Sequence, residues 1–192
     1  MIAAWGSSAP KGWSVVARRI RVPLGFAFAL VYLWLAHPTM TAIVGGSIIV
    51  AAGLAVRGIA SGQLKKNEQL ATTGPYSYTR NPLYLGSIVI AAGFAVAARS
   101  VWIWVLLLVF FMLIYVPVIR GEEAFLRSAF PHFESYCARV PRLVPRWSGE
   151  SLTTNFSREL YLKHREYNAF IGAVLMMVAI TVKMMITQRA GS

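Results

Sequence analysis

The sequence predicts an all-α integral membrane protein with about five transmembrane helices. Three observations support this fold class: an apolar composition, long stretches without charge, and basic residues gathered between alternate stretches. Of the 192 residues, 57% are hydrophobic and 14% are charged, whereas a soluble domain averages about 45–50% apolar and about 25% charged residues. The chain therefore has more apolar side chains than one small soluble core can bury, and the same composition excludes a disordered chain.

Five stretches with little or no charge have roughly the length of a membrane span, since a helix needs about 20 apolar residues to cross a bilayer core. They lie near residues 22–37, 39–56, 82–98, 101–119 and 168–186. The stretch at 101–119 is the clearest, because it has no charge and carries Trp102 and Trp104 near one end. The last stretch contains Lys183 near its end, where we expect the long side chain to snorkel to the membrane interface.

The first stretch has a second interpretation as a cleaved signal peptide, because a basic lead precedes a short apolar run. However, the next apolar run follows after only His37 and Pro38. Two spans joined by a tight turn fit this spacing better, so we interpret 22–37 and 39–56 as two transmembrane helices.

The net charge of +12 comes from 19 Lys and Arg against seven acids, all of them Glu. In a soluble protein this charge suggests nucleic-acid binding, but in an apolar chain it more often marks loops held on the cytoplasmic side. Basic residues concentrate in 1–21, 57–81 and 120–167, and the loops between the other spans are nearly neutral. We expect these three segments to be cytoplasmic and to contact anionic lipids, the C-terminus to lie outside, and no nucleic acid to be a partner.

Several kinds of site are disfavoured by the sequence. Cys137 is the one cysteine, which excludes an intrachain disulfide and a Cys-rich zinc site. His37, His132 and His164 lack the spacing of metal ligands, so we expect no metal site. The sequence contains neither a phosphate-binding glycine loop nor a serine nucleophile elbow.

The polar segment 65–87 is the first that could carry chemistry. Gly74-Pro75 signals a turn, and Asn81-Pro82 predicts a helix start with Asn at the N-cap and Pro in the first turn. The free N–H groups of that helix end favour an anion, and Arg80 lies beside them. A purely structural interpretation is also open, with a helix cap, a lipid-headgroup anchor and tyrosines of an interfacial belt.

The second such segment begins with the adjacent acids Glu122 and Glu123, which follow the span at 101–119. Neighbours on a helix point about 100° apart, and negative charge is disfavoured at a helix C-terminus. Acids near membrane depth are rare and tend to face a cavity or a partner. We therefore treat functional and structural roles of this pair as equally open from the residues alone.

These two segments resemble the signature of the membrane-embedded methyltransferases related to isoprenylcysteine carboxyl methyltransferase and phospholipid methyltransferase. The family pattern is a Gly-Pro-Tyr turn, an Arg-His-Pro-x-Tyr-x-Gly motif that opens a span, another span, and a Glu-Glu pair. The matching residues here are Gly74-Pro75-Tyr76, Arg80-Asn81-Pro82-Leu83-Tyr84-Leu85-Gly86, Glu122-Glu123 and a tail at 130–142. The resemblance covers about residues 63–145. Asn81 replaces the family's His and cannot titrate near neutral pH, so we interpret it as a capping or cofactor-contact residue.

The resemblance implies S-adenosylmethionine as the cofactor, bound at the cytoplasmic end of the helices. The implied cofactor-site residues are Arg80, Asn81, Pro82, Tyr84, Gly86, Glu122 and Glu123, and the candidate catalytic residues among them are Arg80, Glu122 and Glu123. We expect one Glu to pair with the cofactor's amino group. Arg80 or the helix N-terminus is expected to hold its carboxylate, and Gly86 to permit a close approach of the chain.

The implied function is methyl transfer to a lipidic or prenylated acceptor, resembling carboxylate O-methylation most closely. The alternatives are a phospholipid or amine N-methyltransferase, and a non-methylating reductase or lipid-binding protein on the same scaffold. An amine must first lose a proton, which a Glu could accept, whereas a carboxylate needs no base. A transporter or structural subunit is disfavoured, because the polar residues gather on one side and not within broken spans.

Overall fold

The computed structural model describes residues 13–65, 69–149, 151–152 and 156–190, and within them the chain forms helices and no strand. The elements in chain order are α1 (Trp13–Leu35), α2 (Met40–Ser61), α3 (Pro75–Tyr78), α4 (Pro82–Ala98), α5 (Val101–Phe110), the π-helical turn η1 (Phe111–Tyr115), α6 (Val116–Ala129), α7 (Phe133–Arg139), α8 (Arg158–Lys163) and α9 (Tyr167–Ala190). The predicted all-α class is confirmed for this part of the chain.

Three of the described helices are long and apolar enough to cross a membrane, namely Met40–Ser61, Val101–Ala129 and Tyr167–Ala190. Pro23–Leu35 and Pro82–Ala98 are shorter apolar helices at the first and third predicted spans. At about 1.5 Å per residue, the 17 residues of α4 extend only about 25 Å, against a core of about 30 Å. The structure therefore supports a membrane protein with three candidate spans, and the number five stays a prediction.

The helix that begins at Val101 continues to Ala129, ten residues beyond the predicted end of the span at residue 119, and the end of the span itself stays a prediction. Pro117 lies in this run and has no N–H to donate to the preceding turn, and the wide turn of η1 comes just before it. The consequence for the site is direct. Glu122 and Glu123 lie within α6 and not at its C-terminus. The expected unfavourable interaction of their charge with the end of the helix dipole therefore does not apply.

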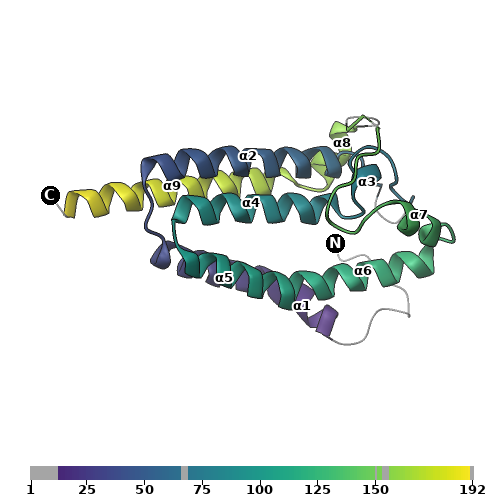
Figure 1. The fold of residues 1–192 in the computed structure, drawn as a ribbon, viewed down its shortest axis with the longest axis horizontal. Coiled ribbons are helices and arrows are strands. Elements are labelled where there is room, and N and C mark those ends of the chain that lie inside the picture. Colours follow the sequence, from purple (N-terminus) through teal and green to yellow (C-terminus); the bar gives the residue numbers. More distant parts are fainter. Residues whose placement is uncertain (1–12, 66–68, 150, 153–155, 191–192) are drawn as a thin grey trace.

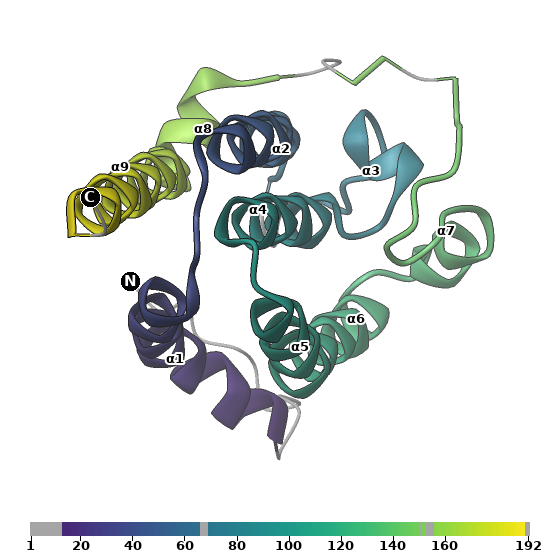
Figure 2. The ribbon, with the colours of Figure 1, turned by 60° about the vertical axis from the view of Figure 1, so that its left-hand side comes forward.

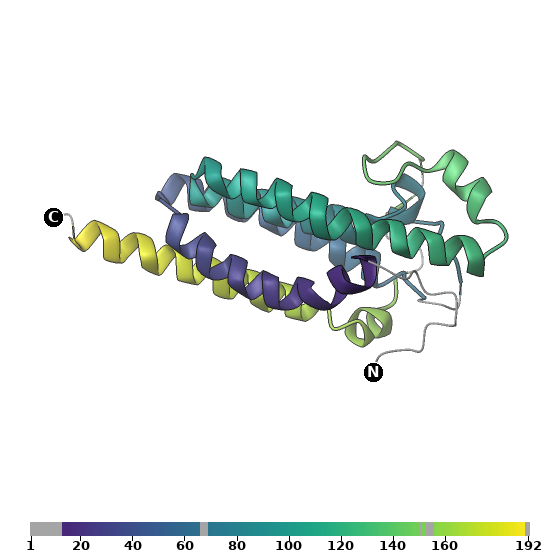
Figure 3. The ribbon, with the colours of Figure 1, turned by 90° about the horizontal axis from the view of Figure 1, so that it is seen from below.

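The long helices run side by side as an elongated bundle (Figure 1). Viewed closer to its axis, α2 packs on α4, α9 lies on the outer side of α2, and α5 with α6 lies across from them (Figure 2). The helix α1 closes the remaining side and contacts α9, α5 and α6 (Figure 3). Residues of α1, α4, α5 and α9 line a common cavity, which is described below with the site.

Close contact between α2 and α4 depends on facing glycines. A Cβ on Gly46 would lie 2.5 Å from the carbonyl oxygen of Gly93, and a Cβ on Gly86 would lie 2.8 Å from the carbonyl oxygen of Gly53. Such distances leave no room for a side chain, so the two backbones approach as in small-residue packing of membrane helices. Gly86 therefore serves helix packing, and its expected role beside a ligand stays a prediction.

Lys183 on α9 binds the C-terminal end of α1. Its ammonium donates hydrogen bonds to the carbonyl oxygens of Leu33, Trp34 and Ala36, the last at 2.6 Å. These carbonyls have no partner within the helix, and a cation also suits the negative end of the helix dipole. This contact ties α9 to α1, and the expected snorkelling to the membrane interface stays a prediction.

The polar segments gather at one end of the bundle, where α3, α7 and α8 lie, while α9 ends at the opposite end (Figure 1). This arrangement places the loops before α4 and after α6 together. The side of the membrane that this end faces stays a prediction.

Candidate active site

The two polar segments are joined by hydrogen bonds along their length, which brings the sequence motifs together. The Arg80 N–H donates to the Pro141 carbonyl at 2.9 Å, and the Arg146 N–H donates to the Tyr78 carbonyl at 2.9 Å. The Tyr136 hydroxyl donates to the Tyr76 carbonyl at 2.6 Å. Segment 76–81 is thus fixed against the chain that follows α7, at the entrance to α4.

The turn that starts this segment requires glycine. Gly74 has φ of 59° and ψ of −131°, and a Cβ there would lie 2.0 Å from Oε1 of Gln63. Other residues rarely adopt this conformation. The Gly-Pro-Tyr motif therefore acts locally, by turning the chain into α3.

Glu123 is committed to an ion-pair cluster. Its side chain is 4% exposed, and its carboxylate accepts hydrogen bonds from Nε and Nη2 of Arg142 at 2.7–3.1 Å. Nη1 of Arg80 lies 3.6 Å from the same carboxylate. The bidentate contact raises the pKa of Arg142 above its ordinary value, because the carboxylate stabilises the charged guanidinium. Glu123 thus holds the two segments together.

Glu122 differs from its neighbour. Its side chain is partly buried, and it makes no hydrogen bond or ion pair with the residues that the structure describes. It lines a polar cavity of about 380 Å³, and Glu123, Tyr76 and Arg80 line the same cavity. Of the two acids, Glu122 is the one whose carboxylate is available to a ligand.

This polar cavity lies between α3, α4, α6 and α7 and brings most of the predicted residues together. The predicted residues that line it are Arg80, Asn81, Pro82, Tyr84, Glu122 and Glu123. Gly86 faces α2 instead. Six of the seven sequence predictions therefore share one cavity.

Asn81 occupies the N-cap position of α4, but its side chain does not cap the helix. Its Nδ2 donates instead to the Arg142 carbonyl at 3.0 Å. The predicted capping role is therefore wrong, and Asn81 links α4 to the chain after α7 while lining the polar cavity.

Two buried polar atoms at this cavity have no hydrogen-bond partner, the hydroxyl of Tyr76 and Nε of Arg80. A buried polar atom without a partner is costly and calls for a ligand or water. Tyr76 is 6% exposed, and burial raises its pKa well above the ordinary value, with the charges of Tyr136 and Glu122 adding to the shift. Its hydroxyl therefore stays protonated at neutral pH and can donate a hydrogen bond.

The sequence interpretation missed an ion pair at the same end of the bundle. Arg57 on α2 donates from Nε and Nη2 to both carboxylate oxygens of Glu166 at 2.8–3.0 Å. The side chains are 23% and 12% exposed. A signal was present, since Arg57 is the single charge near the end of the second apolar stretch and Glu166 comes just before the fifth.

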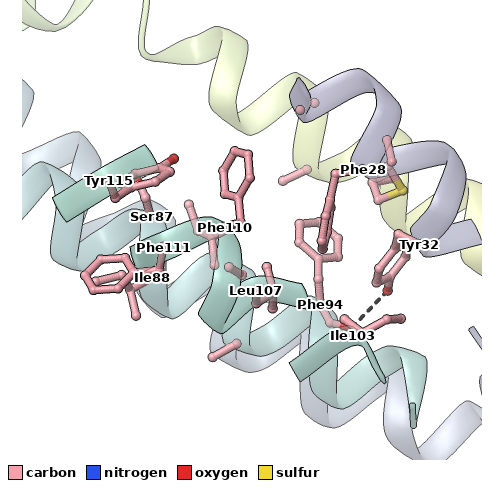
Figure 4. A pocket seen from close by; sticks show the side chains of 18 of the residues that line it. Phe28, Tyr32, Ser87, Ile88, Phe94, Ile103, Leu107, Phe110, Phe111 and Tyr115 are labelled. Carbon is pink, nitrogen blue, oxygen red and sulfur yellow. Dashed lines mark hydrogen bonds between the residues drawn. The ribbon is translucent and has the colours of Figure 1, made fainter. Parts of the chain in front are cut away.

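Next to the polar cavity lies an apolar chamber of about 680 Å³, lined by residues of α1, α2, α4, α5, η1 and α9. Aromatic and aliphatic side chains such as Phe28, Leu107 and Phe110 line it (Figure 4). Ser87 lies at one end and Tyr32 at the other, where the Tyr32 hydroxyl donates to the Phe94 carbonyl at 2.9 Å (Figure 4). Its volume is within the range of about 300–1,000 Å³ typical of ligand sites.

Among the described residues, no three His, Cys, Asp or Glu side chains gather in the way that a metal site requires. The polar cavity holds acids, arginines and tyrosines instead. Its side chains suit an organic ligand that carries both a cation and an anion.

Comparison with known proteins gives one family and two curated relatives. The model of the phospholipid methyltransferase family matches residues 31–132, slightly more than half of the chain. This match confirms the resemblance that the motifs predict. It spans α2 to α6 and thereby includes the Arg80 motif and the acidic pair.

Both relatives are named for metal resistance. Cobalt-zinc-cadmium resistance protein CzcN of Cupriavidus metallidurans is 42% identical over 93 residues, which cover 47% of this chain and 43% of the relative. Nickel-cobalt-cadmium resistance protein NccN of Alcaligenes xylosoxydans xylosoxydans is 39% identical over 84 residues, or 44% of this chain and 39% of the relative. The chain matches less than half the length of either relative. No solved structure shows a significant match.

Proposed function

Because the chain belongs to the phospholipid methyltransferase family, we propose that it transfers a methyl group from S-adenosylmethionine to a lipidic acceptor in the membrane. The observation that carries this proposal is the junction of two unlike cavities. The polar cavity is built from the family motifs, and the apolar chamber meets it at Arg57. A charged cofactor and an apolar acceptor could thus reach one point from different sides.

The residues of the polar cavity fit the charged end of the cofactor. Glu122, which has no partner among the described residues, offers its carboxylate to the amino group of the cofactor. The Tyr76 hydroxyl and Nε of Arg80 are buried donors for the carboxylate of the cofactor. This assignment refines the expectation from sequence. Glu123 forms ion pairs with Arg142 and Arg80, so Glu122 is the acid proposed to contact the cofactor.

The bound cofactor would supply an electrophilic methyl group attached to a sulfonium sulfur, and the sulfur would become a neutral thioether when the methyl group is transferred. The protein's part is to position the acceptor and to exclude water, which supplies most of the rate in such a transfer. The apolar chamber does both, because aromatic and aliphatic side chains surround it.

The lining of the chamber favours a carboxylate acceptor over an amine. Arg57 is the one charged side chain among the described residues that line it, and no acid does so. A carboxylate is already ionised at neutral pH, whereas an amine needs a base near its nitrogen. Amine methylation therefore stands as the alternative that the product analysis tests.

We also propose that the motif end of the bundle faces the cytoplasm, where the cofactor is made. The basic residues of 57–81 and 120–167 support this orientation through the positive-inside rule. This orientation is tested by the reaction of Cys137 with a membrane-impermeant thiol reagent in sealed vesicles.

Binding of S-adenosylmethionine to the purified chain is the deciding experiment. We expect saturable binding that Glu122→Gln weakens about tenfold or more, since a contact with a charged group contributes about 1.5–3 kcal/mol. Arg127→Gln is the matched control, because Arg127 is an exposed residue outside both cavities that pairs with Glu134. Absence of binding by the unmodified chain refutes the proposal and leaves a lipid-binding scaffold or a reductase.

Where binding is found, the acceptor chemistry can be read from the product. The labelled methyl group is recovered in a lipid extract, and mild base then releases it from an ester. Base-stable label indicates N-methylation instead.

A further inference from the structure

Arg57 lies at the boundary of the apolar chamber and the polar cavity, and among the described residues it alone lines both. Its guanidinium has two differently occupied sides. Nε and Nη2 bind Glu166, which lines the polar cavity. Nη1 donates to the Leu83 carbonyl at 3.3 Å and to the Ser87 hydroxyl at 2.5 Å, and Ser87 lines the chamber. Leu83 lines the polar cavity, so Nη1 lies where the two cavities meet, within hydrogen-bond distance of a residue of the chamber.

The ion pair fixes this orientation. A bidentate carboxylate contact holds the planar guanidinium in one plane, and Glu166 approaches it from the side away from the chamber. Ion pairs this buried add little net stability, so geometry is what the pair supplies. Neither residue belongs to a motif matched from the sequence.

Among the described residues that line the chamber, Arg57 is the one charged side chain, so an acidic head group of an amphiphile finds its charged partner there. The Tyr32 hydroxyl at the far end is committed to the Phe94 carbonyl. At the near end Nη1 of Arg57 is the donor that a head group can meet, and Glu166 lies behind the guanidinium. An acidic head group can replace Ser87 as the acceptor of Nη1, while the Ser87 hydroxyl keeps the Leu83 carbonyl as its own acceptor at 2.9 Å.

We propose that Arg57 is a positioning residue, which Glu166 holds in place, and that it binds the acidic head group of an amphiphile whose tail fills the chamber. The head group is thereby held at the wall of the polar cavity. This inference rests on the proposed methyl transfer and its carboxylate acceptor, to which it adds the residue pair that places the acceptor.

Equilibrium binding of tritiated palmitate to the purified chain in a neutral detergent tests the proposal without any methyl transfer. Unlabelled palmitate, methyl palmitate and hexadecylamine are compared as competitors at a pH where palmitate is ionised. The three share one tail and differ in the charge of the head group. We expect palmitate to compete about tenfold or more better than the ester or the amine, which is the usual effect of a charge-assisted hydrogen bond. Equal competition by the acid and the ester, or no binding of palmitate, overturns the proposal.

Variants then locate the preference. In Arg57→Gln combined with Glu166→Gln, no unpaired buried charge remains, and we expect the acid's advantage over the ester to vanish while ester binding is kept. Arg57→Lys retains the charge and is expected to retain most of the preference, and Arg127→Gln is expected to change nothing. A preference that persists in the double variant overturns the role of Arg57.

Measuring S-adenosylhomocysteine binding to the same samples separates this proposal from the proposed function. Cofactor-analogue binding without any head-group preference refutes the role of Arg57 alone. A head-group preference without analogue binding supports the role of Arg57 as a ligand contact and refutes methyl transfer.

Discussion

The carboxylate of Glu123 and the guanidinium of Arg142, 19 residues later in the chain, form a bidentate ion pair with an Nη2–Oε2 distance of 2.7 Å. Arg80 adds a third charge at 3.6 Å. This cluster ties α6 to both polar segments. Its neighbour Glu122 takes no part and faces the polar cavity, so two adjacent acids have separable roles.

Separate roles predict opposite effects of two matched substitutions. Glu123→Gln removes the charge that two arginines share, and we expect the free energy of unfolding to fall by about 1.5–3 kcal/mol, which is the contribution of hydrogen bonds to a charged group. Glu122→Gln is expected to leave the melting temperature nearly unchanged and to weaken S-adenosylhomocysteine binding. Thermal unfolding in detergent and equilibrium binding measure the two effects. A larger loss of stability in Glu122→Gln than in Glu123→Gln contradicts this assignment.

Two tyrosines at the same end offer a second matched pair. The Tyr136 hydroxyl donates to the Tyr76 carbonyl, whereas the Tyr76 hydroxyl is buried without a partner. Tyr136→Phe leaves a buried carbonyl unpaired, so we expect a loss of about 1–3 kcal/mol in stability. Tyr76→Phe removes an unpaired hydroxyl and is expected to keep or raise the melting temperature while weakening binding of the cofactor analogue. Unaltered analogue binding in Tyr76→Phe means that this hydroxyl does not contact the cofactor.

The apolar stretches predicted the helices well because long uncharged runs permit little else. The prediction for 82–98 coincides with α4, since Pro82 starts that helix and Arg99 adopts a left-handed conformation at its end. The continuation of the helix from residue 119 to Ala129 was not predicted, because the first charge was taken as the boundary. The helix continues past Arg120 and the acids because α6 still buries one face, which includes Val118 and Ile119.

The sequence predicted which residues line the polar cavity, but it did not predict the role of each residue. Motif spacing identified six residues that line one cavity, yet it could not tell a partnered acid from an unpartnered one. That distinction depends on the contact of Glu123 with Arg142 at the end of the matched tail, which motif spacing does not show. Arg57 and Glu166 are separated by 109 positions, and spacing in the sequence cannot show that they meet.

Lys183 supports a third prediction, about the link between α9 and α1. Its ammonium binds carbonyl groups at the end of α1, so Lys183→Met leaves those groups unpaired at a similar side-chain volume. We expect unfolding to become easier by about 1.5–3 kcal/mol. Thr187→Ala one turn later is the control, since Thr187 bonds only within its own helix. Equal melting temperatures for Lys183→Met and the unmodified chain contradict the proposed link.

The last prediction concerns two adjacent glycines on α2 that have opposite surroundings. Gly46 faces α4, where a Cβ would lie 2.5 Å from the Gly93 carbonyl oxygen and 2.7 Å from the Cβ of Ala97, while a Cβ on Gly45 meets nothing within 4 Å. Gly46→Ala therefore overpacks the contact, and we expect a loss of about 1–3 kcal/mol. Gly45→Ala is expected to raise stability by about 0.5–1 kcal/mol, because alanine loses less conformational freedom in a helix.

Unfolding of the two variants in the same detergent provides the comparison. Because the substitutions are chemically identical and adjacent, differences in helix propensity and membrane insertion cancel, and the remaining difference reports the distance between α2 and α4. That distance matters for the site, since Arg57 on α2 reaches Leu83 and Ser87 on α4 across the same contact. We therefore expect Gly46→Ala also to weaken the binding of palmitate, while Gly45→Ala leaves it unchanged. Equal stability of the two variants indicates that the helices are farther apart than the glycine contacts require.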